Sequence, residues 1–110
     1  MDRYEKQLFA DALDELQAET YANAKAHGFH DNEDNPLHIP TYLALIGTEV
    51  SEAIEAHRKG KMNDIPSELA DIMIRTMDLA ESMKISLANA IFEKHEFNKS
   101  RPLKHGNKLY

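Results

Sequence analysis

The 110-residue chain contains no cysteine, which excludes disulfide bonds, thiol catalysis and thiolate-ligated metal sites. No apolar run approaches the roughly 20 residues that a transmembrane helix needs. The sequence also lacks a phosphate-cradling glycine loop, a catalytic Ser/His/Asp order and a dinucleotide-binding fingerprint. Any chemistry must therefore come from other charged and polar side chains.

Positive charge is also scarce: 13 Lys and Arg stand against 19 Asp and Glu, a net charge of −6 with neutral histidines. A broad nucleic-acid-binding face needs clustered cations and is not expected. Residues 1–16 are acidic and amphipathic, unlike a signal or transit peptide. We expect one cytoplasmic domain over residues 1–110 that binds neither membranes nor nucleic acid.

Only four glycines and four prolines interrupt the chain, and strand-type alternation is nowhere sustained. The pattern predicts an all-α bundle of about four helices. The expected helices cover about residues 3–27, 40–59, 64–84 and 87–98. Residues 28–39 are predicted to form a polar linker, with a lid over the base of a ligand as the alternative. The six histidines are expected to occupy scattered surface or half-buried positions. A bundle this small buries a limited share of its surface, which favours a homo-oligomer.

The second predicted helix carries one acidic residue toward its packed face. At about 100° per residue, Glu49 lies at the edge of the apolar arc and Glu52 lies one turn on, just outside it. Glu55 points to the solvent side. The sequence thus predicts that Glu49, unlike Glu55, lies close to the packed face of the helix.

The third predicted helix is apolar over more than half of its circumference, so it should be surrounded on most sides. The remaining strip comprises Glu68, Asp71, Arg75, Asp78 and Ser82. This strip should face either a solvent gap or a pocket. Asp78 could be a further metal ligand or could pair with Arg75.

Two acidic pairs, Glu49-x-x-Glu52 and Glu68-x-x-Asp71, each place two carboxylates on one helix face. If the two helices pack antiparallel, the four carboxylates converge, and a hard divalent cation would offset their repulsion. Two Mg²⁺ ions would suit phosphoryl chemistry. The alternative is a pair of ordinary solvated helix faces.

The C-terminal segment 98–110 is basic and has no acidic residue. Lys94, Asn98 and Arg101 share a face if the last helix persists that far. Such cations, together with a metal site, match a triphosphate ligand. His105 could be a further phosphate contact. The alternative is a solvated tail whose charge suits the helix C-terminus.

The stretches GTEVSEAIEA and SELADIMIRTMDLA resemble the ExxE…ExxD signature of MazG-like all-α nucleoside triphosphate pyrophosphohydrolases. The ending KHEFNKSRPLKHGNKLY is similar to the K…N..R…HG.K ending of that family. The likeness spans roughly residues 43–108. The first helix and the linker match no signature, which leaves the preferred base open.

The resemblance implies an enzyme, dependent on Mg²⁺ or Mn²⁺, that cuts a nucleotide between its α- and β-phosphates and forms dimers or tetramers. The implied metal ligands are Glu49, Glu52, Glu68 and Asp71. The implied catalytic residues, which hold or deprotonate the attacking water, are Glu49 and Glu52. The implied substrate-binding residues are Lys94, Asn98, Arg101 and Lys108. Two alternatives stay open: a phosphoribosyl-ATP pyrophosphohydrolase, and a non-catalytic helical interaction module.

Overall fold

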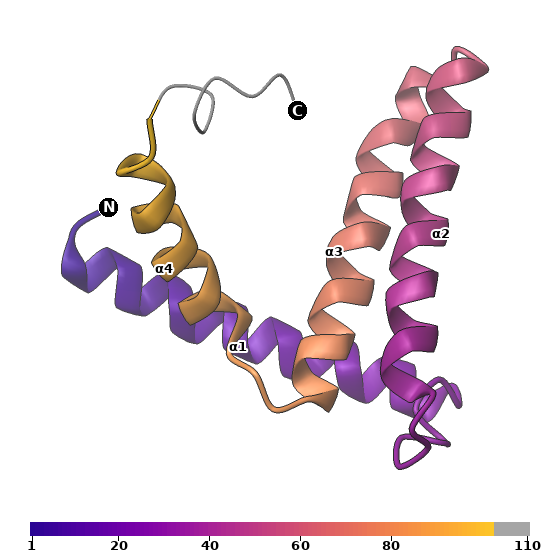
Figure 1. Cartoon of the computed structure of the whole chain (residues 1–110), viewed down its shortest axis with the longest axis horizontal. Helices are drawn as coiled ribbons and strands as arrows, with labels where there is room; N and C mark the ends of the chain where they lie inside the picture. Colours follow the sequence, from indigo (N-terminus) through magenta and orange to yellow (C-terminus); the bar gives the residue numbers. More distant parts are fainter. Residues whose placement is uncertain (103–110) are drawn as a thin grey trace.

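The computed structural model describes residues 1–102 (Figure 1). Its helices are α1 (Arg3–Ala26), α2 (His38–Arg58), α3 (Ile65–Ser82) and α4 (Leu87–Lys99), with a 3-10 turn η1 (Met62–Asp64) before α3. These residues contain no strand, and the predicted all-α fold of four helices is confirmed. None of the helices in this part of the chain combines the length and apolar character that a membrane crossing requires.

Local signals explain where the helices begin and end. A capping box starts α1: the Glu5 amide donates to the Asp2 carboxylate at 2.8 Å, and the Asp2 amide donates to the Glu5 carboxylate at 2.9 Å. Gly28 and Gly60 follow α1 and α2 with φ angles of 85° and 71°. Glycine adopts this left-handed conformation without the penalty that a Cβ atom imposes.

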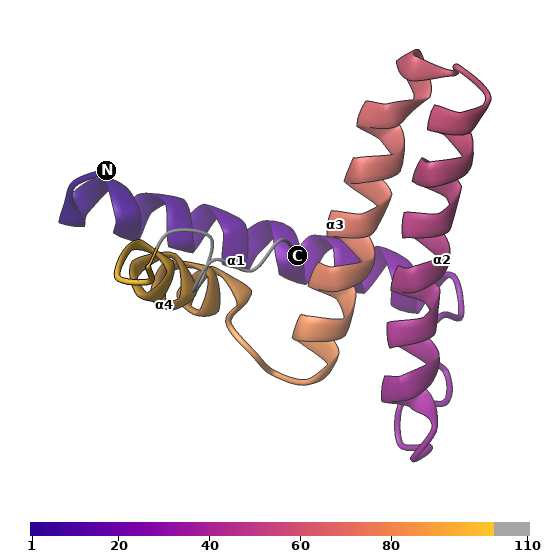
Figure 2. The same cartoon turned by 45° about the horizontal axis from the view of Figure 1, so that its top comes forward.

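The helices form two arms rather than a closed bundle (Figures 1 and 2). Helices α2 and α3 make an antiparallel pair joined through η1, and the C-terminal half of α1 crosses the base of this pair. Helix α4 lies along the N-terminal half of α1. The radius of gyration is 16.3 Å, against about 13 Å for a compact domain of this length.

The buried core is small and concentrates where the arms meet. Its larger members are Tyr42, Met77 and Leu79, and the others are alanines such as Ala24 and Ala80. Apolar side chains farther out stay accessible: Leu69 is 54% exposed, and Met73, Ile54 and Leu43 are exposed as well. Within the single chain, the wide apolar face predicted for the third helix is therefore only partly covered.

The linker between α1 and α2 is anchored to α1 and α3. Glu33 accepts hydrogen bonds from the Tyr21 hydroxyl at 2.5 Å and from the Ser82 hydroxyl at 2.9 Å. These donors lower the pKa of Glu33, and the same bond raises the pKa of Tyr21 to about 12. Glu33 is thus a charged acceptor at neutral pH, and Tyr21 is a protonated donor.

The prediction that the histidines are scattered was wrong for two of them. Nδ1 of His30 lies 3.2 Å from Nε2 of His38, and the His30 side chain is only 3% exposed. Burial lowers the pKa of His30. The linker folds back onto the start of α2. No local pattern in the sequence predicted this contact.

A buried glutamine ties the α3–α4 connection to α1. Gln17 is 2% exposed, and its Nε2 donates to the Ile85 carbonyl at 2.8 Å and to Glu81 Oε1 at 3.0 Å. The helical arms are thus linked by a polar contact as well as by apolar packing.

We expect Gln17→Ala to lower the free energy of unfolding by about 1–3 kcal/mol, because the buried Gln17 side chain makes hydrogen bonds to Ile85 and Glu81 that the variant loses. Urea denaturation at one fixed protein concentration measures the change. Gln7→Ala is the matched control: Gln7 bonds only the exposed Asp11 on its own helix, so the loss should stay within about 0.5 kcal/mol. Equal losses in both variants would contradict this role of Gln17.

Candidate active site

The antiparallel α2–α3 pair brings three carboxylates together. One oxygen each from Glu49, Glu68 and Asp71 lies within 4.8 Å of the other two. Glu49 comes from α2 and the other two residues from α3. Glu52, the fourth predicted ligand, lies beside this group and is exposed. The structure therefore assembles most of the predicted acidic cluster, with Glu52 at its margin.

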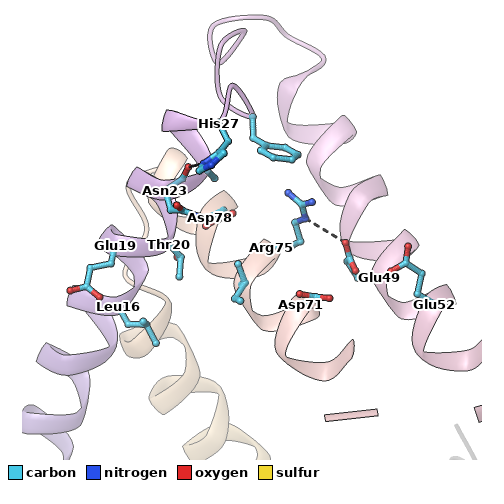
Figure 3. A pocket seen from close by; sticks show the side chains of 13 residues that line it. Leu16, Glu19, Thr20, Asn23, His27, Glu49, Glu52, Asp71, Arg75 and Asp78 are labelled. Carbon is cyan, nitrogen blue, oxygen red and sulfur yellow. Dashed lines mark hydrogen bonds and ion pairs between the residues drawn. The ribbon is translucent and has the colours of Figure 1, made fainter. Parts of the chain in front are cut away.

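The environment of Glu49 shows that negative charge is in excess here. The Glu49 side chain is 13% exposed, and its pKa is raised by burial and by the neighbouring carboxylates of Glu52 and Asp71. Arg75 acts in the opposite direction, with its Nε 3.5 Å from Glu49 Oε1 (Figure 3). One guanidinium thus offsets only part of the repulsion.

The cluster fits a divalent cation. Oε2 of Glu68 is buried and has no hydrogen-bond partner among the described residues, although such an atom normally has one. Carboxylate oxygens are the ligands that Mg²⁺ and Mn²⁺ prefer, whereas zinc sites favour imidazole or thiolate. Glu49, Glu68 and Asp71 could therefore hold a hard divalent metal.

A cavity of about 610 Å³ lies beside the carboxylates, between α1, α2 and α3. Glu49, Glu52 and Asp71 line one side of it. Across from them, α1 contributes the polar side chains of Thr20 and Asn23 (Figure 3). Its volume falls in the range of small-molecule sites, about 300–1,000 Å³.

Arg75 lies between the acidic and the aromatic parts of the cavity. Its Cζ atom lies 4.5 Å from the centroid of the Phe29 ring, a cation–π contact. The same guanidinium pairs with Glu49. Arg75 is thus held in place beside the carboxylates, where a phosphate could reach it.

Asp78 also lines the cavity but stands apart from the three-carboxylate group. It is 1% exposed, its Oδ1 has no hydrogen-bond partner among the described residues, and burial raises its pKa. The ion pair of Arg75 is with Glu49, not with Asp78. Asp78 was predicted either to be a further metal ligand or to pair with Arg75. The structure does not contain the ion pair.

The sequence analysis missed the contribution of α1. Thr20, Asn23 and His27 line the cavity, together with Phe29 just beyond the helix. The spacing of Thr20, Asn23 and the C-cap residue His27 places them on one side of the helix, a signal that could have been found. Nothing local, however, indicated that this face meets α2 and α3.

The predicted phosphate-binding residues lie on the other arm. Lys94 and Asn98 belong to α4 and Arg101 follows it, and none of them lines the cavity. Lys94 and Arg101 instead lie over the Phe97 ring, at 4.8 and 5.6 Å from its centroid. Lys108 and His105 lie outside the described residues. Within residues 1–102, a single chain does not bring Lys94 or Arg101 to the cavity beside the carboxylates.

Comparison with known proteins gives a family. No curated protein and no solved structure matches the chain. The phosphoribosyl-ATP pyrophosphohydrolase family matches residues 6–98, which include both acidic pairs and nearly all of the four helices. This all-helical family falls within the MazG-like pyrophosphohydrolases, as the acidic pairs predicted. The chain therefore belongs to the phosphoribosyl-ATP pyrophosphohydrolase family and is a hydrolase that acts on phosphoric anhydrides.

Proposed function

We propose that the chain is a Mg²⁺-dependent pyrophosphohydrolase that cleaves a nucleoside triphosphate between its α- and β-phosphates. The products are a nucleoside monophosphate and pyrophosphate. The observation that carries the proposal is the convergence of Glu49, Glu68 and Asp71 at the wall of a nucleotide-sized cavity. The family match supports the same reaction class.

The three clustered carboxylates and Glu52 act as the metal ligands in this proposal. Bound Mg²⁺, or Mn²⁺ in its place, supplies Lewis-acid polarisation and neutralises phosphate charge. Glu49 or Glu52 orients the attacking water and takes its proton. Burial and the neighbouring carboxylates raise the pKa of Glu49, which makes it a stronger base than an ordinary glutamate.

The rest of the cavity positions the substrate. Arg75 exchanges its contact with Glu49 for one with a phosphate oxygen, which a guanidinium binds through two donors. Phe29, beneath that guanidinium, offers a flat apolar surface to a base. Thr20 and Asn23 supply hydrogen-bonding groups for the sugar or the base edge.

A second copy of the chain completes the site in this proposal. A homo-oligomer, a dimer or a tetramer, would cover exposed apolar residues such as Leu69 and Met73. It would also allow Lys94, Asn98 and Arg101 of one copy to reach the phosphates held by another. The open two-arm shape, with its radius of gyration of 16.3 Å, supports this arrangement. Lys108 stays a predicted phosphate ligand, and the cytoplasm stays the predicted location.

Phosphoribosyl-ATP is the second candidate substrate, and the name of the matched family favours it. This molecule carries the same triphosphate group, so the chemistry at Glu49, Glu68 and Asp71 is unchanged. The difference lies at the base, where it carries an additional phosphorylated sugar. Among the residues that line the cavity, Arg75 carries a positive charge, and His27 and Asn23 offer side-chain N–H donors to such a group.

We expect the chain to release pyrophosphate and a nucleoside monophosphate only when Mg²⁺ is present, because the carboxylates repel an uncomplexed triphosphate. The measurement is pyrophosphate release from a panel of ribo- and deoxyribonucleoside triphosphates and phosphoribosyl-ATP. The release of inorganic phosphate and of nucleoside diphosphates is measured as a control, because these products would indicate cleavage at a different position. No metal-dependent turnover of any member of the panel would refute the proposed reaction.

We expect Glu49→Gln, Glu52→Gln, Glu68→Gln and Asp71→Asn each to lower kcat by at least about 100-fold, the scale of general base and metal-ligand losses. Glu55→Gln is the matched control, since Glu55 lies on the same helix but is exposed and pairs only with Arg58 and Lys59. Steady-state kinetics would record the change, with circular dichroism to check folding. Wild-type-like turnover in all four cluster variants would rule out the assignment.

Glu49→Gln should also show separately how the clustered negative charge affects stability without metal and how Mg²⁺ binding affects it. Because the folded chain raises the pKa of Glu49, the stability linked to this group is present at low pH and is lost as the pH rises through the raised value. Without metal at pH 7.5, the variant should therefore unfold at a higher temperature than the wild type. Millimolar Mg²⁺ should stabilise the wild type and not the variant.

The difference between the two proteins without metal should shrink as the pH falls through the raised pKa of Glu49, and it should be gone below the ordinary glutamate pKa of about 4.3. Thermal melts over a pH series measure it, again with Glu55→Gln as the control. A metal-free Glu49→Gln variant that is less stable at pH 7.5 would mean that the Arg75 contact outweighs the repulsion.

A further inference from the structure

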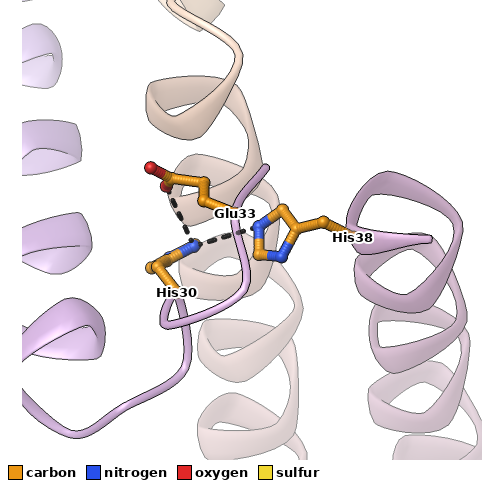
Figure 4. A group of neighbouring side chains, drawn as sticks. All are labelled: His30, Glu33 and His38. Atoms are coloured by element: carbon orange, nitrogen blue, oxygen red, sulfur yellow. Dashed lines mark hydrogen bonds and ion pairs between the residues drawn. The ribbon is translucent and has the colours of Figure 1, made fainter. Parts of the chain in front are cut away.

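A second group of potential metal ligands lies where the α1–α2 linker meets the start of α2, and it shares no residue with the acidic cluster. His30, Glu33 and His38 each point one donor atom toward the same place (Figure 4). Nδ1 of His30 lies 3.2 Å from Nε2 of His38 and 3.5 Å from Oε2 of Glu33. All three donor atoms lie within 4.8 Å of one another.

These separations are those of ligands around one small cation. Metal–ligand bonds of about 2.0–2.1 Å in a tetrahedral zinc site place neighbouring donor atoms about 3.3–3.4 Å apart. A shared proton could join the two ring nitrogens as an N–H···N bond, and the hydrogen bonds from Tyr21 and Ser82 would then hold the Glu33 oxygen beside them. A cation at the centre would bind the facing lone pairs of the two imidazole nitrogens and be balanced by the negative charge of the Glu33 carboxylate.

The surrounding residues orient the ligands as outer-shell partners do in metal sites. The other ring nitrogen of His30, Nε2, lies 3.2 Å from the Tyr42 hydroxyl, and the two rings are stacked at an interplanar angle of 12°. The Glu33 oxygen that faces His30 accepts hydrogen bonds from Tyr21 and Ser82. These partners come from α1, α2 and α3, so three helices hold the ligand set.

The donor types indicate which metal the group would take. Two imidazole nitrogens and one carboxylate oxygen suit Zn²⁺ and similar borderline cations, whereas Mg²⁺ prefers oxygen ligands alone. Three protein ligands leave a fourth position for water, as in open zinc sites. The acidic cluster, which has no nitrogen ligand, is the poorer zinc site of the two.

We propose that His30, Glu33 and His38 bind one zinc-class cation that fastens the α1–α2 linker to the junction of α1, α2 and α3, separately from the hard-metal site at Glu49, Glu68 and Asp71. The linker includes Phe29, which lines the cavity. The bound cation thus holds one wall of the substrate cavity in place. The inference stands on the ligand geometry alone and does not depend on the proposed reaction.

The test is isothermal titration calorimetry of the full chain, stripped of metal with a chelator and titrated with Zn²⁺ in excess Mg²⁺. The Mg²⁺ occupies the carboxylate cluster and leaves the histidine group as the zinc site. We expect one equivalent of Zn²⁺ per chain and a rise in melting temperature that Mg²⁺ alone does not produce. Substituting Co²⁺ should give the intense visible absorption of a tetrahedral site.

His38→Gln and Glu33→Gln should each weaken Zn²⁺ binding by at least about tenfold. His57→Gln is the matched control, because His57 is exposed at the other end of α2 and should leave the affinity unchanged. Two ligand variants are used so that a folding defect in one does not decide the outcome, and circular dichroism checks each.

Three results would overturn the proposal. The first is a wild-type chain that binds no Zn²⁺ in excess Mg²⁺. The second is wild-type affinity in both ligand variants. The third is loss of the zinc equivalent in Glu49→Gln but not in His38→Gln, which would place the ion in the acidic cluster.

Discussion

The antiparallel packing of α2 against α3 is the constraint on which the rest of the site depends. It places carboxylates from two helices within one small volume, where Glu49 is half-buried and one oxygen of Glu68 has no partner among the described residues. Arg75 offsets part of the repulsion. The negative charge that Arg75 does not offset would be stabilised by a divalent cation. The repulsion that destabilises the metal-free cluster is therefore also the source of its metal affinity.

The crossing of α1 beneath this pair converts a charged helix face into a cavity. Without α1, the carboxylates of α2 and α3 would line an open groove; with it, Thr20 and Asn23 face them across a nucleotide-sized space. The same crossing sends α4 along the opposite end of α1, away from the carboxylates. The enzyme thus separates its acidic and basic parts within one chain, which association between chains would reunite.

Two ligand sets of different chemistry lie in one small protein. The oxygen-only set spans α2 and α3, and the histidine-containing set lies where the linker meets α2. Most protein sites rank the divalent metals in the same order of affinity. Selectivity between hard and borderline cations therefore depends on the type of donor atom and on geometry. Two different ions could therefore occupy the chain together without exchanging places.

The sequence by itself determined the helices and the acidic pairs. Both depend on neighbours three or four residues apart, and the glycine stops at Gly28 and Gly60 act locally as well. The tertiary structure alone decided that Arg75 pairs with Glu49, that His30 meets His38, and that Arg101 does not line the cavity beside the carboxylates. Each of these outcomes depends on how helices cross, and crossing is set by side-chain packing between distant segments, which periodicity along one helix does not encode.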